Sequence, residues 1–306
     1  MNEPLPGMPR SLRGMLMIMA AVAMFAVMDS ISKYLTRFYP VTMVVWARYA
    51  FHTLLVTALL GPRLGLALVR TRRPGTQIVR GLLLAASTLL FVAALKYQPL
   101  AESSAISFLA PLLVTMMAVL VLKEQVELAR WLAVSAGFVG VLIIMRPGSG
   151  VFAWSSLLPL GTAACFASYQ ILTRRIAGLE SPHTSIFYSG LVGMLLLSLA
   201  LPDAWRPPQS WFHAFLFIAV GCIAGFSHLT LIKAYEFAPA AKLAPFSYTQ
   251  LIWATVVGYL VFGDFPDRWS LLGIAILMAS GIYIATHQHL SERLLRAAQQ
   301  EGTPGA

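Results

Sequence analysis

The chain has 306 residues, of which 58% are hydrophobic and 11% are charged, whereas a soluble domain carries about a quarter charged residues. This composition excludes a water-soluble protein and indicates one that lies in a membrane. The formal net charge of +10 does not indicate nucleic-acid binding, because no basic soluble module is present to carry it. We assign the positive excess to membrane topology and to contact with anionic membrane lipid.

Ten segments are apolar and long enough to cross a bilayer, which takes about 20 residues in a helix. In chain order they cover residues 14–34, 41–60, 77–95, 102–122, 128–145, 151–173, 184–201, 211–232, 243–262 and 269–286. The connections between them are short, and the tail after His287 is expected to be a loop. The sequence therefore predicts an all-α integral membrane protein with ten transmembrane helices and no soluble domain.

The distribution of Lys and Arg predicts the orientation, since positive residues beside spans are retained on the cytoplasmic side. With the N-terminus inside, fifteen of the 22 fall in cytoplasmic segments, Arg80 among them, and six in outer segments. The remaining one, Arg48, lies within the second span. Both tails, residues 1–13 and 287–306, are therefore predicted to be cytoplasmic. A multi-pass protein of the bacterial inner (plasma) membrane is expected.

The chain contains an internal duplication of about 140 residues. Laying residues 94–124 over 234–264 gives seven identities in 31 positions and aligns Phe108 with Tyr248. We place the first repeat at 14–147 and the second at 148–286, with five spans in each. Because five is odd, the second half lies upside down relative to the first, which makes two inverted five-helix repeats.

Inverted repeats of this kind are typical of secondary transporters, which bind cargo near the membrane midplane between the repeats. An enzyme is disfavoured, because the sequence has no HExxH, no GxSxG in a strand–turn–helix context and no Walker A motif. Cys165 and Cys222 both fall in predicted spans without metal-ligand spacing. We therefore expect no catalytic residue, no metal and no cofactor.

Three stretches carry a family resemblance: ALKYQPLAESSAISFLAPLLVTMMAVLVLKE (94–124), GFVGVLIIMRPG (137–148) and AYEFAPAAKLAPFSYTQLIWATVVGYLVFGD (234–264). With them the chain resembles the drug/metabolite transporter superfamily, in particular its EamA-type members. The resemblance implies alternating access without ATP. By family analogy we expect an exporter of an amino acid or an amino-acid-derived compound such as a metallophore. The alternative is an importer of a vitamin or nucleotide-like metabolite, such as riboflavin or S-adenosylmethionine.

Charged residues inside spans are the first candidates for the transport site, because they are costly there and usually face a bundle interior. Asp29 is a candidate for cargo contact and for a coupling proton, or is a partly hydrated group bonded to Lys33 four residues on. Arg48 suits a carboxylate or phosphate of the cargo, an ion pair with Asp29, or a snorkelling position. His228 is a second candidate for proton coupling, or is simply hydrogen-bonded in place.

The fourth and ninth predicted spans carry further candidates. Each contains a proline, Pro111 or Pro245, and interrupted helices at corresponding positions point to a transporter site. The substrate-binding candidates are Asp29, Arg48, Ser104, Ser107, Phe108, Tyr169, Gln170, Tyr248, Gln250 and Trp253. Their hydroxyls and rings serve equally well for helix packing. A homodimer is possible, since Gly273 and Gly281 suit either a dimer seam or internal packing.

Overall fold

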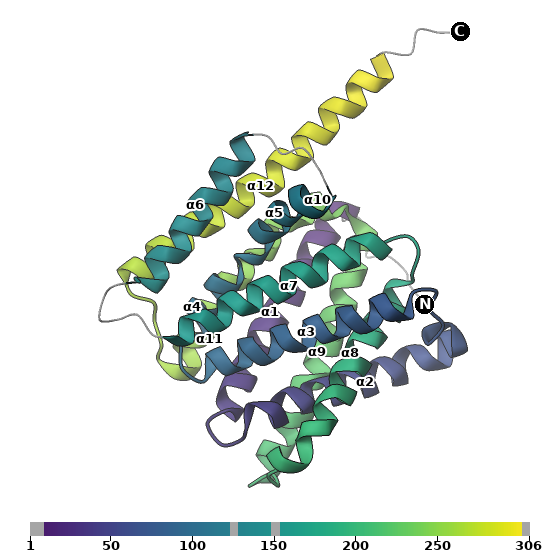
Figure 1. Ribbon diagram of the computed structural model, residues 1–306, viewed down its shortest axis with the longest axis vertical. Helices are drawn as coiled ribbons and strands as arrows, with labels where there is room; N and C mark the ends of the chain where they lie inside the picture. The colour runs from purple at the N-terminus through teal and green to yellow at the C-terminus, as the bar shows by residue number, and fades with distance from the viewer. Residues whose placement is uncertain (1–8, 123–127, 148–153, 302–306) are drawn as a thin grey trace.

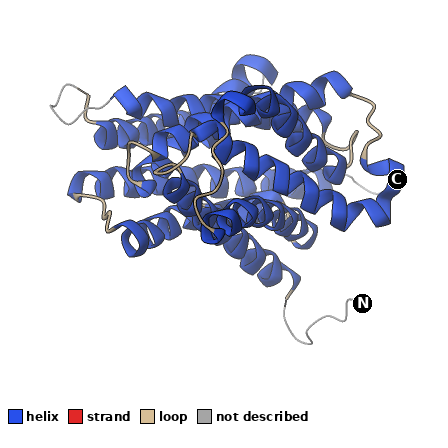
Figure 2. Ribbon diagram, turned by 90° about the horizontal axis from the view of Figure 1, so that it is seen from below, coloured by secondary structure: helices blue, strands red, loops and turns tan. Residues whose placement is uncertain are grey.

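A computed structural model of the chain describes residues 9–122, 128–147 and 154–301, which are helices joined by turns and loops without a β-strand (Figure 1, Figure 2). The helices of the first half are α1 (Arg10–Leu35), α2 (Val41–Leu64), η1 (Gly65–Leu68), α3 (Pro74–Leu95), α4 (Leu100–Ser107), α5 (Ala110–Leu122) and α6 (Leu128–Met145). Those of the second half are η2 (Trp154–Ser156), α7 (Leu157–Ile176), α8 (Pro182–Ala204), α9 (Trp211–Phe237), α10 (Ala240–Ser247), α11 (Thr249–Phe262) and α12 (Arg268–Glu301).

These helices make the ten expected spans. Seven segments satisfy length and composition for a membrane crossing by themselves, and α6, α7 and α11 with α10 complete the two sets of five. The pairs α4 with α5 and α10 with α11 each form one interrupted span. The acid Glu124, at the end of the first repeat stretch, lies outside the described residues.

Prolines and acids place several helix starts. Pro99 and Pro239, which the repeat aligns, precede α4 and α10 with nearly equal backbone angles, φ −56° and ψ 147° against φ −59° and ψ 147°. Asp267 caps α12, since its Oδ1 accepts from the backbone N–H of Trp269 at 3.1 Å and of Ser270 at 2.8 Å. The bond from the Ser270 N–H lowers the pKa of the Asp267 carboxyl below its ordinary value. These local signals fix the residues at which α4, α10 and α12 begin.

Two groups of helices pack side by side. α2 contacts α8 and α9, and α3 contacts α7 and α8, while α6 and α12 lie together along the opposite edge (Figure 1). A Cβ at Gly273 of α12 would lie 2.5 Å from the Gly140 carbonyl oxygen, and one at Gly281 would lie 1.8 Å from the Tyr248 hydroxyl. Both glycines of the proposed dimer seam are thus taken up by internal packing. A homodimer stays a prediction.

The end of the chain differs from the expected loop. α12 continues past His287 to Glu301 and extends beyond the bundle (Figure 1). The residues concerned, HQHLSERLLRAAQQE, contain neither Gly nor Pro and are rich in strong helix formers. The hydropathy that ends the membrane span therefore does not end the helix.

Candidate functional site

Asp29 of α1 and Arg48 of α2 form a buried ion pair. Arg48 Nη1 donates to Asp29 Oδ1 at 3.2 Å, and the two side chains are 16% and 6% exposed. Lys33 instead donates to Asp264 Oδ2 at 2.6 Å. The interpretation of Asp29 as a partly hydrated group bonded to Lys33 is therefore wrong, because burial leaves Asp29 with a nearer cation. The alternative, an ion pair with Arg48, is confirmed.

Two histidines extend this polar cluster. His52 follows Arg48 by one turn of α2, and its ring centroid lies 5.5 Å from that of His228 on α9. Phe25 of α1 contacts the His228 ring edge-on at 5.0 Å. Among the described residues, His52 Nε2 and His228 Nδ1 are buried without a hydrogen-bond partner, although buried polar atoms are normally paired. Nδ1 of His228 is therefore not held by a hydrogen bond, and both of these nitrogens are the kind of group that a cargo or proton would satisfy.

Glycines of α8 and α9 let α2 approach closely enough to bury these side chains. A Cβ added at Gly221 of α9 would lie 2.4 Å from Phe51 Cβ and 2.9 Å from the Arg48 carbonyl oxygen. On the α8 side, a Cβ at Gly190 would lie 2.6 Å from Thr53 Oγ1. Small residues at helix crossings are the usual way in which membrane helices come into backbone contact. The positions of Arg48 and His52 between α8 and α9 therefore depend on Gly190 and Gly221, which have no side chain.

The interrupted spans break at the positions that the repeat aligns. Phe108 follows α4, and Tyr248 separates α10 from α11. Their rings lie 5.3 Å apart, and Tyr248 is only 3% exposed. Pro111 lacks the N–H that would bond the Ser107 carbonyl, so the ladder is open at the first break. The predicted interruption of both spans is confirmed, but Pro245 lies inside α10 and the second break comes three residues later, at Tyr248. The two breaks bring Phe108 and Tyr248 into contact.

The other candidates are spread over separate surroundings. Ser104 is 2% exposed and its hydroxyl is buried without a partner among the described residues. Ser107 Oγ donates to the Ser103 carbonyl at 2.8 Å, a bond within its own helix. Gln170 of α7 and Gln250 of α11 are half-buried, whereas Trp253 is 38% exposed. Trp253 shares its face of α11 with exposed apolar residues, an arrangement that suits lipid better than a cavity.

Arg80 of α3 is the site residue that sequence reasoning missed. It was counted among the cytoplasmic positive residues, but it is 1% exposed and ranks among the largest fully buried side chains. Its guanidinium lies 4.9 Å over the ring of Tyr169, one of the predicted candidates. The sequence did contain a signal for Arg80: it is a charged residue inside the apolar segment 77–95, just as Asp29 is a charged residue inside the apolar segment 14–34. Without it, fourteen cytoplasmic positive residues still face six outer ones, so the predicted orientation stands.

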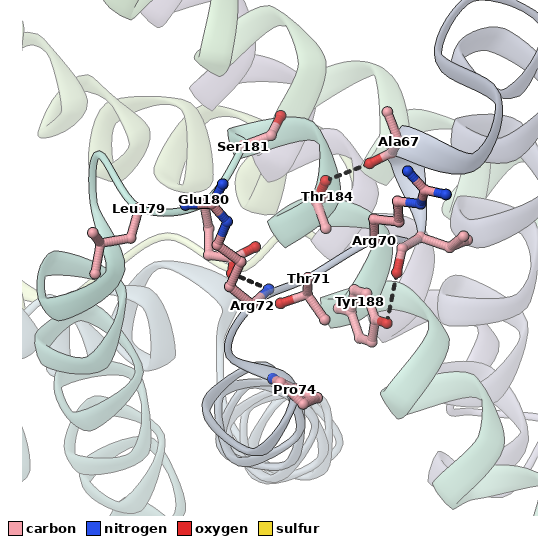
Figure 3. Close-up of a pocket in the computed structure, with 11 residues that line it drawn as sticks. Ala67, Arg70, Thr71, Arg72, Pro74, Leu179, Glu180, Ser181, Thr184 and Tyr188 are labelled. Carbon is pink, nitrogen blue, oxygen red and sulfur yellow. Dashed lines mark hydrogen bonds between the residues drawn. The ribbon is translucent and has the colours of Figure 1, made fainter.

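A cavity of about 730 Å³ opens between the α2–α3 and α7–α8 connections (Figure 3). We call it the vestibule; in the predicted orientation it is on the cytoplasmic side. Arg70, Arg72 and Glu180 line it, and the Arg72 backbone N–H donates to Glu180 Oε1 at 2.7 Å. Tyr188 of α8 closes one wall by donating to the Val69 carbonyl at 2.9 Å. The lining has two arginines against one carboxylate, so it favours anionic groups.

Ion pairs join the two halves at the opposite end of the bundle. Lys33 of α1 pairs with Asp264, which follows α11, and Arg146 after α6 pairs with Asp267 before α12. Lys33 also donates to the Gln98 carbonyl at 3.1 Å. Each pair links one repeat to the other. Any separation of the halves at this end must break both pairs.

Comparison with known families adds an independent finding. Residues 12–146 and 153–286 each match the EamA-like transporter family. The chain belongs to the EamA-like transporter family. This confirms the resemblance to EamA-type members of the drug/metabolite transporter superfamily, and with it that the protein is a multi-pass membrane transporter of small molecules and not an enzyme. Two matched halves of five spans each also give the inverted repeat.

Known relatives align along nearly the whole chain. A riboflavin transporter from Vibrio cholerae is 32% identical over 89% of this chain and 93% of its own length. An S-adenosylmethionine uptake transporter from Rickettsia prowazekii is 28% identical over 89% of this chain and 92% of its own length. A pseudopaline exporter from Pseudomonas aeruginosa is 24% identical over 89% of this chain and 95% of its own length. A crystal structure of a protein with 18% identity aligns over 91% of this chain and 98% of its own with a TM-score of 0.63, a likeness of fold alone.

Proposed function

We propose that this EamA-family protein imports a vitamin or nucleotide-like metabolite, of the chemical kind of riboflavin or S-adenosylmethionine, across the bacterial inner membrane. The observation that carries the proposal is the similarity, over about nine-tenths of the chain, to transporters of these two compounds. Both compounds join a planar heteroaromatic ring to a polar chain. Export of an amino acid or a metallophore, which we first expected, has weaker support, because the exporter among these relatives is less similar.

The distribution of polar groups supports alternating access. Ion pairs between the halves hold the outer end together, while the vestibule lies at the cytoplasmic end. Between them, the cluster of Asp29, Arg48, His52 and His228 lies buried on α1, α2 and α9. In this scheme the halves rock apart at the outer end to admit cargo and close again to release it inside. The cytoplasmic position of both termini belongs to the same proposal.

A coupling proton would act at the same cluster. Among the described residues Asp29 pairs with Arg48, and His52, one turn after Arg48 on α2, contacts the ring of His228, whose Nδ1 is buried. Protonation of Asp29 would release Arg48, and protonation of His228 would repel it, so either event changes the packing of α1 and α9 against α2. Asp29 and His228 are accordingly the residues that we propose for proton coupling.

Uptake into vesicles tests this proposal. The purified protein is reconstituted in proteoliposomes, and labelled riboflavin and S-adenosylmethionine are supplied outside with and without an imposed pH gradient. We expect accumulation of one or both inside, faster with the gradient, and no gradient effect in the Asp29→Asn variant. Movement of a preloaded amino acid or metallophore outward, with neither compound taken up, would instead establish export. Empty vesicles provide the background rate.

A further inference from the structure

Arg80 is a buried cation whose hydrogen-bond partners are all neutral. Its Nε donates to Thr173 Oγ1 at 2.8 Å, its Nη2 to the Tyr169 hydroxyl at 3.3 Å, and its Nη1 to Gln77 Oε1. The guanidinium carbon lies over the Tyr169 ring, 4.9 Å from its centroid. Two helices, α3 and α7, therefore hold this side chain in one orientation. Nothing in this arrangement balances its charge.

Charge balance distinguishes Arg80 from the other buried or half-buried cations that pair with acids. In the part of the chain that the structure describes, three ion pairs occur: Asp29 with Arg48, Asp264 with Lys33, and Asp267 with Arg146. No described carboxylate lies within ion-pair distance of Arg80. A fully buried charge without a countercharge is strongly disfavoured in a membrane protein, and where it persists it marks a substrate or ion path.

The guanidinium also has donors to spare. Of its five N–H groups, three make the bonds described, which leaves one on each terminal nitrogen of Arg80. An N–H group on each of the two terminal nitrogens is what a guanidinium uses to bind a carboxylate through two parallel hydrogen bonds. The Tyr169 hydroxyl, beside Nη2, is a further donor once it turns towards an anion. The chemistry of the group fits a carboxylate bound edge-on above an aromatic ring.

The vestibule lies at the end of α3 that is cytoplasmic in the predicted orientation, and Arg80 lies deeper along the same helix. Pro74 at the start of α3 lines the vestibule, and Arg80 lies six residues further along the helix, about 9 Å at 1.5 Å per residue. Gln77, halfway along, donates from Nε2 to Ser185 Oγ at 3.2 Å, next to the vestibule residue Thr184. A carboxylate would thus pass two rim arginines before it reached the buried one.

We propose that Arg80, positioned by Gln77, Tyr169 and Thr173, binds the carboxylate of the cargo and selects carboxylate-bearing nucleoside-type metabolites over those without one. The inference rests on the proposed function, because it concerns the same cargo. Arg48, to which we first gave this role, is neutralised by Asp29. Among the two kinds of cargo considered, S-adenosylmethionine carries a carboxylate and riboflavin does not, so the inference favours the former.

A matched pair of cargoes isolates the carboxylate. S-adenosylmethionine and its decarboxylated analogue differ in that group alone, and their uptake rates into proteoliposomes give a selectivity ratio. We expect the wild type to prefer S-adenosylmethionine by at least about tenfold, as for a charged hydrogen bond, and Arg80→Gln to bring the ratio within about twofold of one. Arg80→Lys should keep part of the preference. Arg72→Gln, at the rim, should lower the ratio much less than Arg80→Gln does, because the rim arginine is not at the buried site.

Each failure has its own meaning. If the Arg80→Gln variant keeps the selectivity ratio of the wild type, Arg80 does not bind the carboxylate. The same holds if the wild type takes up riboflavin but not S-adenosylmethionine. Neither result contradicts the proposal that the protein is an importer. A wild type that moves neither compound would refute the proposed function. Arg80 is then tested by the melting temperature in acetate against chloride at equal ionic strength. A rise in acetate that Arg80→Gln loses and Arg72→Gln keeps supports anion binding, and an equal rise in all three overturns it.

A variant that fails to fold does not stop the test. If Arg80→Gln aggregates on gel filtration, Arg80→Lys and Tyr169→Phe replace it, since both keep a cation at the position. We expect each to lower the selectivity ratio at least about threefold. An unchanged ratio in both variants would assign Arg80 and Tyr169 to packing and refute the inference.

Discussion

Removing one charge of the Asp29–Arg48 pair should cost more stability than removing both. At 3.2 Å the attraction is about 5 kcal/mol with an effective dielectric constant of 20, and the desolvation of both groups offsets much of it. Asp29→Asn leaves Arg48 buried without a countercharge, and we expect it to lower the free energy of unfolding by about 3 kcal/mol. Arg48→Gln should cost a similar amount. The double variant should cost about 1 kcal/mol, because its two amides carry no charge.

Reversible unfolding in mixed micelles, followed by far-ultraviolet circular dichroism, measures these differences. The matched control is the exposed pair of Arg146 and Asp267, whose side chains are 23% and 49% exposed. Its own double-variant cycle should give a coupling below about 1 kcal/mol. Additive losses at Asp29 and Arg48, with a double variant about 6 kcal/mol less stable, would refute the argument that burial makes the lone charge costly.

Three further changes test other parts of the structure. Gly221→Ala should lower the free energy of unfolding by about 1 to 3 kcal/mol through overpacking against α2, whereas Gly75→Ala, with nothing within 4 Å of an added Cβ, should stay within about 0.5 kcal/mol. Asp264→Asn removes the charged partner of Lys33. It should raise the rate at which a cysteine introduced at position 98 is labelled from outside about fivefold, which corresponds to about 1 kcal/mol in the free energy of opening. Asp267→Ala should cost about 1 kcal/mol at pH 7 by loss of the helix cap.

The last of these changes carries a pH dependence of known sign. The pKa of Asp267 is lowered in the folded protein, so its contribution is present above the unfolded value of about 3.9 and is lost as pH falls through the lower folded pKa. The difference in stability between wild type and Asp267→Ala should therefore shrink below about pH 4. A difference that is constant from pH 7 to pH 3 would contradict the assignment of the cap to the carboxylate.

The other two changes have equally clear contrary outcomes. Equal stability losses in Gly221→Ala and Gly75→Ala would show that α2 and α9 do not meet as closely as the contact at Gly221 requires. Labelling at position 98 is measured with a membrane-impermeant thiol reagent in a background without the two native cysteines. Unchanged labelling in Asp264→Asn would mean that the Lys33 pair does not hold the outer end closed.

Several features of the fold are readable in the sequence because the bilayer limits what a chain can do. An apolar run of about 20 residues has to form a helix there, since its backbone groups find no water to bond. The repeat likewise aligns Pro99 with Pro239 and Phe108 with Tyr248, and a proline in each of the two spans predicts an interruption there, although not the residue at which the helix breaks. Interrupted spans, inverted halves and the family are all consequences of these local and periodic signals.

The partners of the charged residues depend on contacts between distant segments. Lys33 and Arg48 are each close enough in the sequence to serve Asp29, and only the crossing of α1 with α2 decides between them. Arg80 looks like a topology signal until α7 covers it. The sequence by itself determined the ten spans, the inverted repeat and the transporter class, because hydropathy and repetition act along the chain. Only the tertiary structure decided which buried charge has a partner and which does not, because ion pairing depends on helix crossings that no periodicity records.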